Sequence, residues 1–456
     1  MQEELYDIVP EEFIIKSREE SEDGDYLYTL VPVSRRGNCP LCGSFNIIKH
    51  GISARDIRDT SVHGHRVGLH IESSRYLCKS CHGTFNDSFK SITDDAKITN
   101  RLRDYIRKES MLRPFLNIAE ELGMSDTTVR NIFKEYAKSL DDERILKTPR
   151  VLGIDENHIC GTYRAVFVDI EAKTLIEMLP DRKKPHVINF IQSLPNYKNI
   201  KVVTCDMYTG YREAAYECIP HVAVVIDKFH VIKTVNDALE KTRRSLRKEI
   251  GKDESRKLRH SKGLMLKDSD DLSFEQSVAL MELFSEYPMF EEPYRLKEGF
   301  RNIYKCKTKA EVIQKFKEWE SIAKEFTEFI PVIDTVNNWN REIFNYFDYR
   351  YTNAVTESLN KLINDIAEKG RGYSFEVLRL KCLYGTKATK KAKYNFKKYK
   401  VQKEEPASFR RMSFMTSGYM TFEDKPSYEV VEKKELISGF GVDIEELDGI
   451  INSEAF

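Results

Sequence analysis

The pattern of apolar and polar positions changes several times along this chain. Residues 1–90 are rich in turn residues and short β-forming runs. Residues 95–140 carry apolar residues at helical spacing, and residues 148–227 alternate short β-rich runs with helical runs. Residues 228–350 are charged and helix-like with few glycines, and residues 351–385 are helical again. The pattern predicts a small β module, a helical module, an α/β core, a helical insert and a closing helix.

The predicted α/β core has an informative order of elements. Its strand-like runs are 151–155, 165–170, 174–179, 201–206 and 221–226, and its helical runs are 185–194 and 208–218. Three strands, helix, strand, helix, strand is the order of the ribonuclease H fold, whose first and fourth strands lie side by side. These strands end at Asp155 and Asp206. We therefore expect the two carboxylates to meet at one edge of a mixed sheet.

A third carboxylate is expected from the closing helix. Glu357 opens an amphipathic run with Val355 and Leu359 on its apolar side. Carboxylate oxygens bind hard divalent cations such as Mg²⁺ or Mn²⁺. Two such ions about 3.5–4 Å apart activate an oxygen nucleophile and stabilise the leaving oxygen of a phosphoryl displacement. Asp155, Asp206 and Glu357 are thus the predicted catalytic metal ligands, although each residue type is also common at such positions without a catalytic role.

Two Cys-x-x-Cys pairs stand in the N-terminal module. Cys39 and Cys42 form one, Cys78 and Cys81 the other, and 35 residues separate the pairs. Two residues between thiols let one turn aim both sulfurs at one ion, and two such turns supply the tetrahedral set that Zn²⁺ prefers. The sequence predicts a structural zinc site with one or two β-hairpins between its knuckles, the knuckle turns being assigned to Gly43 and Gly83. Coincidental cysteines and a redox pair are the alternatives.

Residues 114–140 have the pattern of a helix-turn-helix. An apolar helical run ends at Gly123, Ser125 can cap the next helix, and that helix has an apolar stripe on one side. A plain pair of helices would look similar. The polar side of the second helix could reach phosphates and base edges. The predicted DNA-contacting residues there are Thr127, Thr128, Arg130, Asn131 and Lys134. Arg243, Arg247 and Lys361 are further candidates, with a solvated helix face as the alternative for the two arginines.

Composition narrows the class of protein. The 456 residues contain 73 Lys+Arg and 73 Asp+Glu, yet the charge is unevenly placed. Residues 387–411 hold ten Lys/Arg and two Glu, whereas residues 423–456 hold ten Asp/Glu and three Lys. Nine cysteines, an odd number, fit reduced thiols and metal ligands better than a disulfide framework. The short apolar runs and the acidic start predict neither a membrane span nor a signal peptide, so a cytoplasmic location is expected.

Across nearly its whole length the chain resembles the DDE transposases of the ISL group of bacterial insertion sequences. The matching pieces are the two cysteine knuckles, the helix-turn-helix, and the segments 153–156, 202–211, 227–239 and 353–364. The resemblance implies the same catalytic residues, Asp155, Asp206 and Glu357. It also implies an auxiliary Asp-x-x-His motif at Asp227 and His230. Where the family often has Asn-Gly before the glutamate helix, this chain has Asn353 and Ala354.

The resemblance also implies an activity and an organisation. The expected activity is that of a DNA transposase, which cleaves a phosphodiester at the element end and then joins the freed 3′-hydroxyl to target DNA. The expected domains are a zinc-ribbon module (1–90), a helix-turn-helix (91–145), a ribonuclease H-like core (146–230 and 346–385) with a helical insertion (231–345), and a basic segment with an acidic tail (386–456). The expected partners are the element's terminal inverted repeats, target DNA and a second copy of the chain, and the protein would be associated with the nucleoid. Two alternatives remain open: a DNA-binding regulator without catalysis, and a structure-selective nuclease of the same fold.

Overall fold

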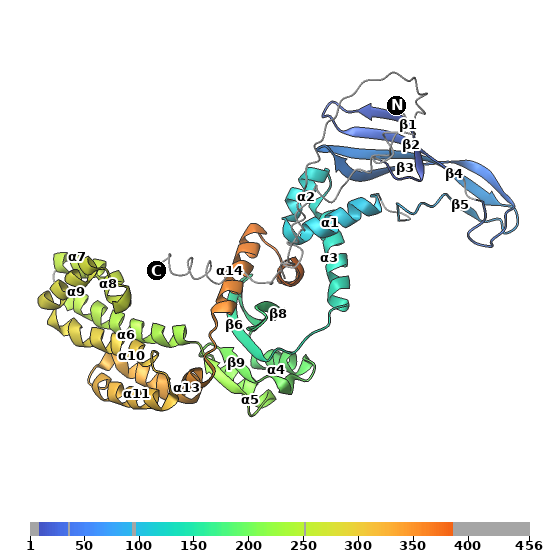
Figure 1. Ribbon diagram of the computed structural model, residues 1–456. Helices are drawn as coiled ribbons and strands as arrows, with labels where there is room; N and C mark the ends of the chain where they lie inside the picture. The colour runs from blue at the N-terminus through green and yellow to red at the C-terminus, as the bar shows by residue number, and fades with distance from the viewer. Residues whose placement is uncertain (1–8, 35–36, 94–96, 250–251, 386–456) are drawn as a thin grey trace, which may run out of the picture. The chain divides into compact units, whose positions relative to one another are not determined.

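The computed structural model describes residues 9–34, 37–93, 97–249 and 252–385 (Figure 1). The basic segment and acidic tail predicted over 386–456 lie outside the described residues. Within the described ranges, no helix combines the length and the apolar character needed to cross a lipid bilayer.

The N-terminal module is a twisted sheet dominated by one long hairpin. Its strands run in the order β1-β2-β4-β3, and β5 pairs with β4. Their bounds are β1 Phe13–Glu20, β2 Tyr26–Pro32, β3 Ile47–Val62, β4 His65–Cys78 and β5 Thr84–Asn86. Alternate residues of β4 are buried, including Leu69 and Ile71, as expected for a strand with one face on a core. The β3–β4 hairpin fills the interval between the two cysteine pairs, which confirms that part of the sequence prediction.

Three helices follow, and they form the predicted helix-turn-helix. Their bounds are α1 Asn100–Leu112, α2 Phe115–Leu122 and α3 Asp126–Asp142. Gly123 ends α2 in the left-handed conformation at φ 61°, and the Ser125 hydroxyl accepts a hydrogen bond from the Thr128 N–H at the start of α3. The sequence predicts both the end of α2 and the start of α3, because helix caps depend on the residue types within one turn. Ile106, Ile118, Val129 and Phe133 fill the shared core.

The central core is a five-stranded mixed sheet of ribonuclease H type. The strand order is β10-β9-β6-β7-β8. Strands β10, β9 and β6 pair in parallel, whereas β7 pairs antiparallel with both β6 and β8. The strands are β6 Val151–Ile159, β7 Thr162–Asp169, β8 Thr174–Met178, β9 Val202–Cys205 and β10 Ala223–Ile226; the connecting helices are α4 Lys184–Ser193 and α5 Thr209–Cys218. The first and fourth strands of the core, β6 and β9, are neighbours, as predicted. The central strands are buried on both faces, which explains their nearly continuous apolar sequence.

A helical insert separates β10 from the last part of the core. Its helices are α6 Lys228–Glu249, α7 Lys252–His260, α8 Lys262–Leu266, α9 Phe274–Glu286, α10 Glu291–Ile303, α11 Lys309–Ala323, α12 Ile330–Asn338 and α13 Asn340–Tyr349. Trp319 and Trp339 are both buried in it, and they share one apolar cluster with the core sheet. The insert therefore packs continuously onto the sheet.

Two helices close the described part of the chain. They are α14 Ala354–Lys369 and α15 Phe375–Leu380, and a single π turn, Lys381–Gly385, follows. α14 packs against β6 and β7 of the core sheet. Val377 and Leu380 of α15 instead belong to the buried cluster of the helix-turn-helix. The helix-turn-helix core is thus completed by residues that lie more than two hundred positions later in the chain.

Candidate active site, zinc cluster and DNA-reading helix

Three aspartates leave the central sheet side by side. The parallel pairing of β6 with β9 ends at Ile154 opposite Cys205, and that of β9 with β10 ends at Cys205 opposite Ile226. The next residue on each strand is an aspartate: Asp155, Asp206 and Asp227. Because the carboxyl ends of parallel strands face the same edge of a sheet, these side chains gather there, at the usual ligand-binding edge of an α/β sheet.

Helix α14 brings the fourth carboxylate to this edge. A Cβ on Gly153 of β6 would lie 2.9 Å from the Thr356 hydroxyl, so glycine permits the helix to approach the strand this closely. Asn353, fully buried just before α14, accepts a hydrogen bond from the Thr204 hydroxyl at 2.8 Å. Its amide also donates to Asp206 at 3.5 Å. These contacts hold the first turn of α14, which carries Glu357, against the strand ends.

Asn360 orients the buried carboxylate of Asp155. Its amide nitrogen donates to Asp155 Oδ2 at 2.8 Å, while the backbone N–H of Glu156 donates to Asp155 Oδ1 at 2.8 Å. Asn360 lies one turn after Glu357 on the same side of α14, so one helix presents both an acidic ligand and the amide that orients another.

The charges at this edge perturb one another strongly. Burial, and then the charge of Asp206, raise the pKa of Asp155 to about 8. Burial, followed by the charge of Asp227, also raises the pKa of Glu357. Carboxyl groups that share a poorly hydrated site cannot all ionise without a compensating cation. Such a set is suited to hold divalent cations.

The imidazole of His230 lies beside two of these carboxylates, Asp206 and Asp227. Its Nε2 lies 3.0 Å from Asp206 Oδ2, and hydrogen bonding to Asp206 and then Asp227 raises the pKa of His230 to about 10. Its Nδ1 is buried and lies 3.8 Å from Asp227 Oδ2, at the distance of an ion pair. The Asp-x-x-His residues implied by the family resemblance therefore lie against Asp206, at the start of α6.

The four carboxylates are less tightly grouped than the cysteines. Within the described ranges, one group of three or more potential metal ligands has all its ligand atoms within 4.8 Å of one another, and it is the group of four cysteines. Carboxylates divided between two ions about 3.5–4 Å apart need not meet that limit. The site is thus a loosely grouped set of carboxylates at the sheet edge, two of which, Asp155 and Asp206, are already oriented by the amides of Asn360 and Asn353.

The four predicted zinc ligands come together at the base of the β3–β4 hairpin. Cys39 Sγ lies 3.7 Å from Cys81 Sγ, and Cys42 Sγ lies 3.6 Å from Cys78 Sγ. The structure corrects one detail. The left-handed residues of the two knuckles are Gly43 and His82, not Gly83. Gly83 is needed for a different reason, because a Cβ there would lie 2.4 Å from the Leu41 side chain. A cluster of four cysteines of this kind is a structural zinc site.

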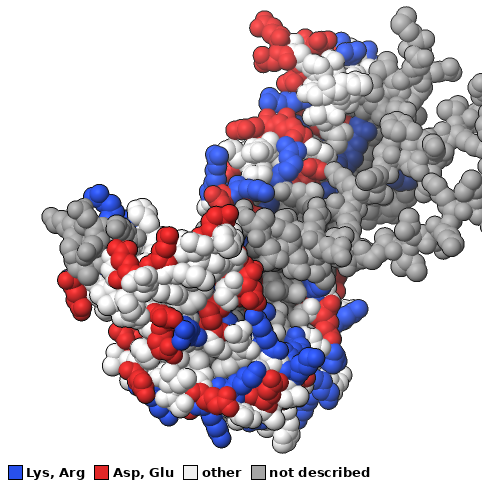
Figure 2. All heavy atoms as spheres, turned by 60° about the vertical axis from the view of Figure 1, so that its left-hand side comes forward, with Lys and Arg blue, Asp and Glu red and all other residues white. Residues whose placement is uncertain are grey.

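The predicted DNA-contacting residues fall into two groups. All five on α3 are exposed on the side opposite the helix-turn-helix core: Thr127, Thr128, Arg130, Asn131 and Lys134. Lys361 is exposed on α14. Arg243 is instead 3% exposed, with its guanidinium on Glu240 and the Leu258 carbonyl. Arg247 is half-buried and donates to Ser255. The two arginines of α6 therefore hold the insert together. On the face seen in Figure 2, acidic and basic side chains are interspersed.

Two residues of the site had no signal in the sequence that assigned their role. Asn353 and Asn360 are ordinary polar residues near a helix start, and only their burial against Asp206 and Asp155 identifies them as orienting groups. The approach of α14 to β6 could have been suspected from Gly153, since a glycine inside a buried strand often marks a close neighbour.

Comparisons with known proteins agree with this arrangement. Residues 152–382 match a transposase family, ISL3; residues 35–81 match the zinc finger of the transposases IS204/IS1001/IS1096/IS1165; and residues 92–137 match the helix-turn-helix domain of transposase family ISL3. A transposase for insertion sequence element IS1001 from Bordetella parapertussis is 22% identical over 358 residues, which cover 75% of this chain and 87% of that protein. With its zinc ribbon, DNA-reading helices and mixed-sheet core all matched, this chain belongs to the ISL3 family of transposases.

Proposed function

We propose that this transposase cuts DNA at the ends of its insertion sequence and joins the freed 3′-hydroxyl to target DNA, with Asp155, Asp206 and Glu357 as the catalytic metal ligands. The observation that carries the proposal is the meeting of strand-end aspartates with a glutamate from a distant helix at one sheet edge. The raised pKa of Asp155 supports the proposal, because carboxylates whose ionisation is disfavoured by burial and by each other's charge are stabilised when a cation binds.

The chain's own residues would prepare this site for an in-line displacement at phosphorus. When bound, Mg²⁺ or Mn²⁺ would supply activation of the attacking oxygen and stabilisation of the leaving one. Asn360 and Asn353 hold the oxygens of Asp155 and Asp206 in position. His230, a cation at neutral pH, offsets part of the acidic charge and favours the approach of a phosphate. Hydrolysis and strand joining are both displacements of this kind, so one site suffices for both.

Recognition of the element ends would fall to the N-terminal modules. The exposed side chains of α3 suit contacts with the major groove and the adjacent phosphates. Lys361 lies on the same helix as Glu357 and suits a phosphate near the cut. Because two ends must be cut and joined, the active assembly would be a dimer or larger. It would act on nucleoid DNA in the bacterial cytoplasm.

A cleavage assay tests the proposal. Full-length protein with Mg²⁺ and a duplex bearing the element end should cut the wild-type substrate, whereas Asp206→Asn or Glu357→Gln should abolish cutting and leave DNA binding within about twofold. Asp365→Asn, an exposed acid on the same helix α14, is the matched control and should cut normally. Cutting by either site variant would remove that residue from the site.

The same assay separates the alternatives. A wild-type protein that binds the element end but never cuts it would be a regulator. Cutting of branched DNA without regard to sequence would indicate a structure-selective nuclease.

A further inference from the structure

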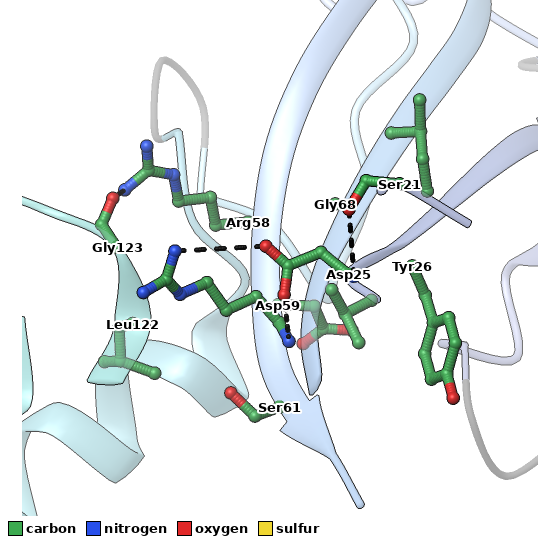
Figure 3. Close-up of a pocket in the computed structure, with 12 residues that line it drawn as sticks. Ser21, Asp25, Tyr26, Arg58, Asp59, Ser61, Gly68, Leu122 and Gly123 are labelled. Atoms are coloured by element: carbon green, nitrogen blue, oxygen red, sulfur yellow. Dashed lines mark hydrogen bonds and ion pairs between the residues drawn. The ribbon is translucent and has the colours of Figure 1, made fainter. Parts of the chain in front are cut away.

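The N-terminal sheet grips the helix-turn-helix at the turn that precedes its recognition helix. Arg66, at the start of β4, donates from Nε to the Glu121 carbonyl at 3.2 Å and from its terminal nitrogen to the Glu120 carbonyl at 2.8 Å. Arg58 of β3 donates to the Gly123 carbonyl. Figure 3 shows Arg58 and Gly123 facing each other from the two modules. The Glu120 and Glu121 carbonyls at the end of α2, and the Gly123 carbonyl just beyond it, thus accept hydrogen bonds from the sheet.

The packing at this turn leaves little freedom. A Cβ on Gly123 would lie 3.1 Å from the guanidinium carbon of Arg66. Glycine is therefore favoured here for two reasons, because it adopts the left-handed backbone without strain and because it leaves room for the Arg66 side chain. A cleft of about 290 Å³ separates the strands from the turn and is lined by Asp25, Arg58 and Arg66 among others. Arg66 also lies 3.9 Å from Asp25, which holds its guanidinium on the sheet side.

A second, independent set of contacts fixes the other end of the helix-turn-helix. The backbone of Arg58 pairs with the segment entering α1, accepting from the Thr99 N–H at 3.0 Å and donating to the Lys97 carbonyl at 2.9 Å. Asp59, whose side chain is fully buried, accepts from the Thr99 hydroxyl at 2.7 Å and from Arg101 Nε at 2.7 Å. Two attachments, at the start of α1 and at the end of α2, prevent rotation about either one.

The sheet also carries a surface suited to DNA. The zinc-bearing end of the hairpin, residues 37–55 and 73–86, contains Lys49, Arg55, Arg75 and Lys79 and no Asp or Glu. Lys49, Arg75 and Lys79 are exposed there. Asp56, Glu72 and Asp87 border this end, and its exposed lysines and arginine favour contact with phosphates.

We propose that Arg58 and Arg66 are positioning residues that join the zinc-ribbon sheet and the recognition helix α3 into one rigid reader, which measures the spacing between two DNA contacts. The inference rests on the proposed recognition of element ends by both N-terminal modules, but not on catalysis. A rigid reader gains the affinity of both contacts only when their separation along the duplex is correct. Specificity would then include a distance as well as two sequences.

The test uses full-length protein, without Mg²⁺, and a duplex bearing the element's own terminal repeat. Hydroxyl-radical footprinting should show two protected tracts, one from the sheet and one from α3. A second duplex carries five extra base pairs between the tracts, about half a helical turn. Wild type should bind this duplex at least about tenfold more weakly. Arg58→Ala/Arg66→Ala should bind the two duplexes with affinities within about threefold of each other.

The matched control removes the same charge from the same module. Lys16→Ala/Arg18→Ala changes two exposed cations of β1 whose ion pairs, with Glu72 and Glu20, lie within the sheet, and it should keep the wild-type spacing dependence. A single footprint tract, equal wild-type binding to both duplexes, or an unchanged spacing dependence in Arg58→Ala/Arg66→Ala would each overturn the proposal. Wild-type binding alone decides two of these outcomes, so a poorly folded variant does not prevent the test. Failure of the cleavage assay would leave this result unaffected, since no cutting is measured.

Discussion

Asp155, one of the proposed metal ligands, is held in an unfavourable state. It is 5% exposed, its neighbour Asp206 carries the same charge, and its hydrogen-bond donors are Asn360 and the backbone of Glu156. The pKa of about 8 means that ionising this carboxyl in the folded protein requires work that is absent in the unfolded chain. The geometry that suits a cation therefore lowers the stability of the cation-free protein.

This argument predicts that Asp155→Asn stabilises the protein in the absence of Mg²⁺. The folded pKa lies above the ordinary value of 3.8, so the contribution of Asp155 to wild-type stability falls as the pH rises from about 4 to about 8 and is level above that. The variant lacks this loss, so its advantage should grow over the same range. Each kcal/mol of relieved repulsion raises the unfolding temperature by about 2–4 °C. Fluorescence of Trp319 and Trp339, both buried in the insert, reports the transition. Asp365→Asn is the control, and an advantage independent of pH would contradict the explanation.

At the scale of elements, the short helix α15 ties the helix-turn-helix to the catalytic core. Arg379 is ion-paired with Asp141 at the end of α3 and with Glu177 of β8. Lys381, 2% exposed, donates to the Ser110 carbonyl and, at 3.0 Å, to the Arg113 carbonyl at the end of α1. Its Nζ lies 4.6 Å from the centre of the Phe115 ring, a cation–π distance. The Lys381 side chain, which follows α15, thus caps α1 of the helix-turn-helix.

Lys381→Met should weaken this attachment while preserving most of the buried volume. Two buried carbonyls would lose their donor, at a cost of about 1–3 kcal/mol each. Segment 144–149, which joins α3 to β6 without regular structure, should then be cleaved faster by proteases, as mass spectrometry of the fragments would show. Lys369→Met, an exposed lysine of α14, should leave the cleavage rate unchanged. Equal protection of wild type and Lys381→Met would mean that the two carbonyls find other partners.

At the scale of the whole molecule, stability is divided among separate cores. The N-terminal sheet, the helix-turn-helix and the mixed-sheet core with its insert each bury their own apolar cluster. Backbone and side-chain hydrogen bonds and ion pairs, rather than a common core, join these parts. Loss of one cluster therefore need not unfold the others.

Removal of zinc tests this division. Cys39→Ser should lower the zinc content, measured by plasma mass spectrometry, and unfold the N-terminal module, because structural zinc contributes directly to folding. The fluorescence of the two tryptophans should keep its wild-type melting transition, since both belong to a different cluster. Cys160→Ser, an exposed cysteine of the core, is the control and should retain zinc. Full zinc occupancy in Cys39→Ser, or a shifted tryptophan transition, would contradict the prediction.

The amino-acid sequence by itself determined what depends on neighbours along the chain. Residue type and short-range periodicity set four features that the sequence predicts: the two cysteine pairs, the left-handed Gly123, the cap at Ser125 and the order of the core strands. Only the tertiary structure decided which distant residues meet. The contacts that only the structure revealed join segments far apart in sequence. They are the orienting contacts of Asn353 and Asn360, the attachment of α15 to the helix-turn-helix, and the hydrogen bonds of Arg66 to the end of α2. The burial of Arg243 is a further consequence of packing. Periodicity carries no information about such contacts, because they arise from the summed packing of whole elements.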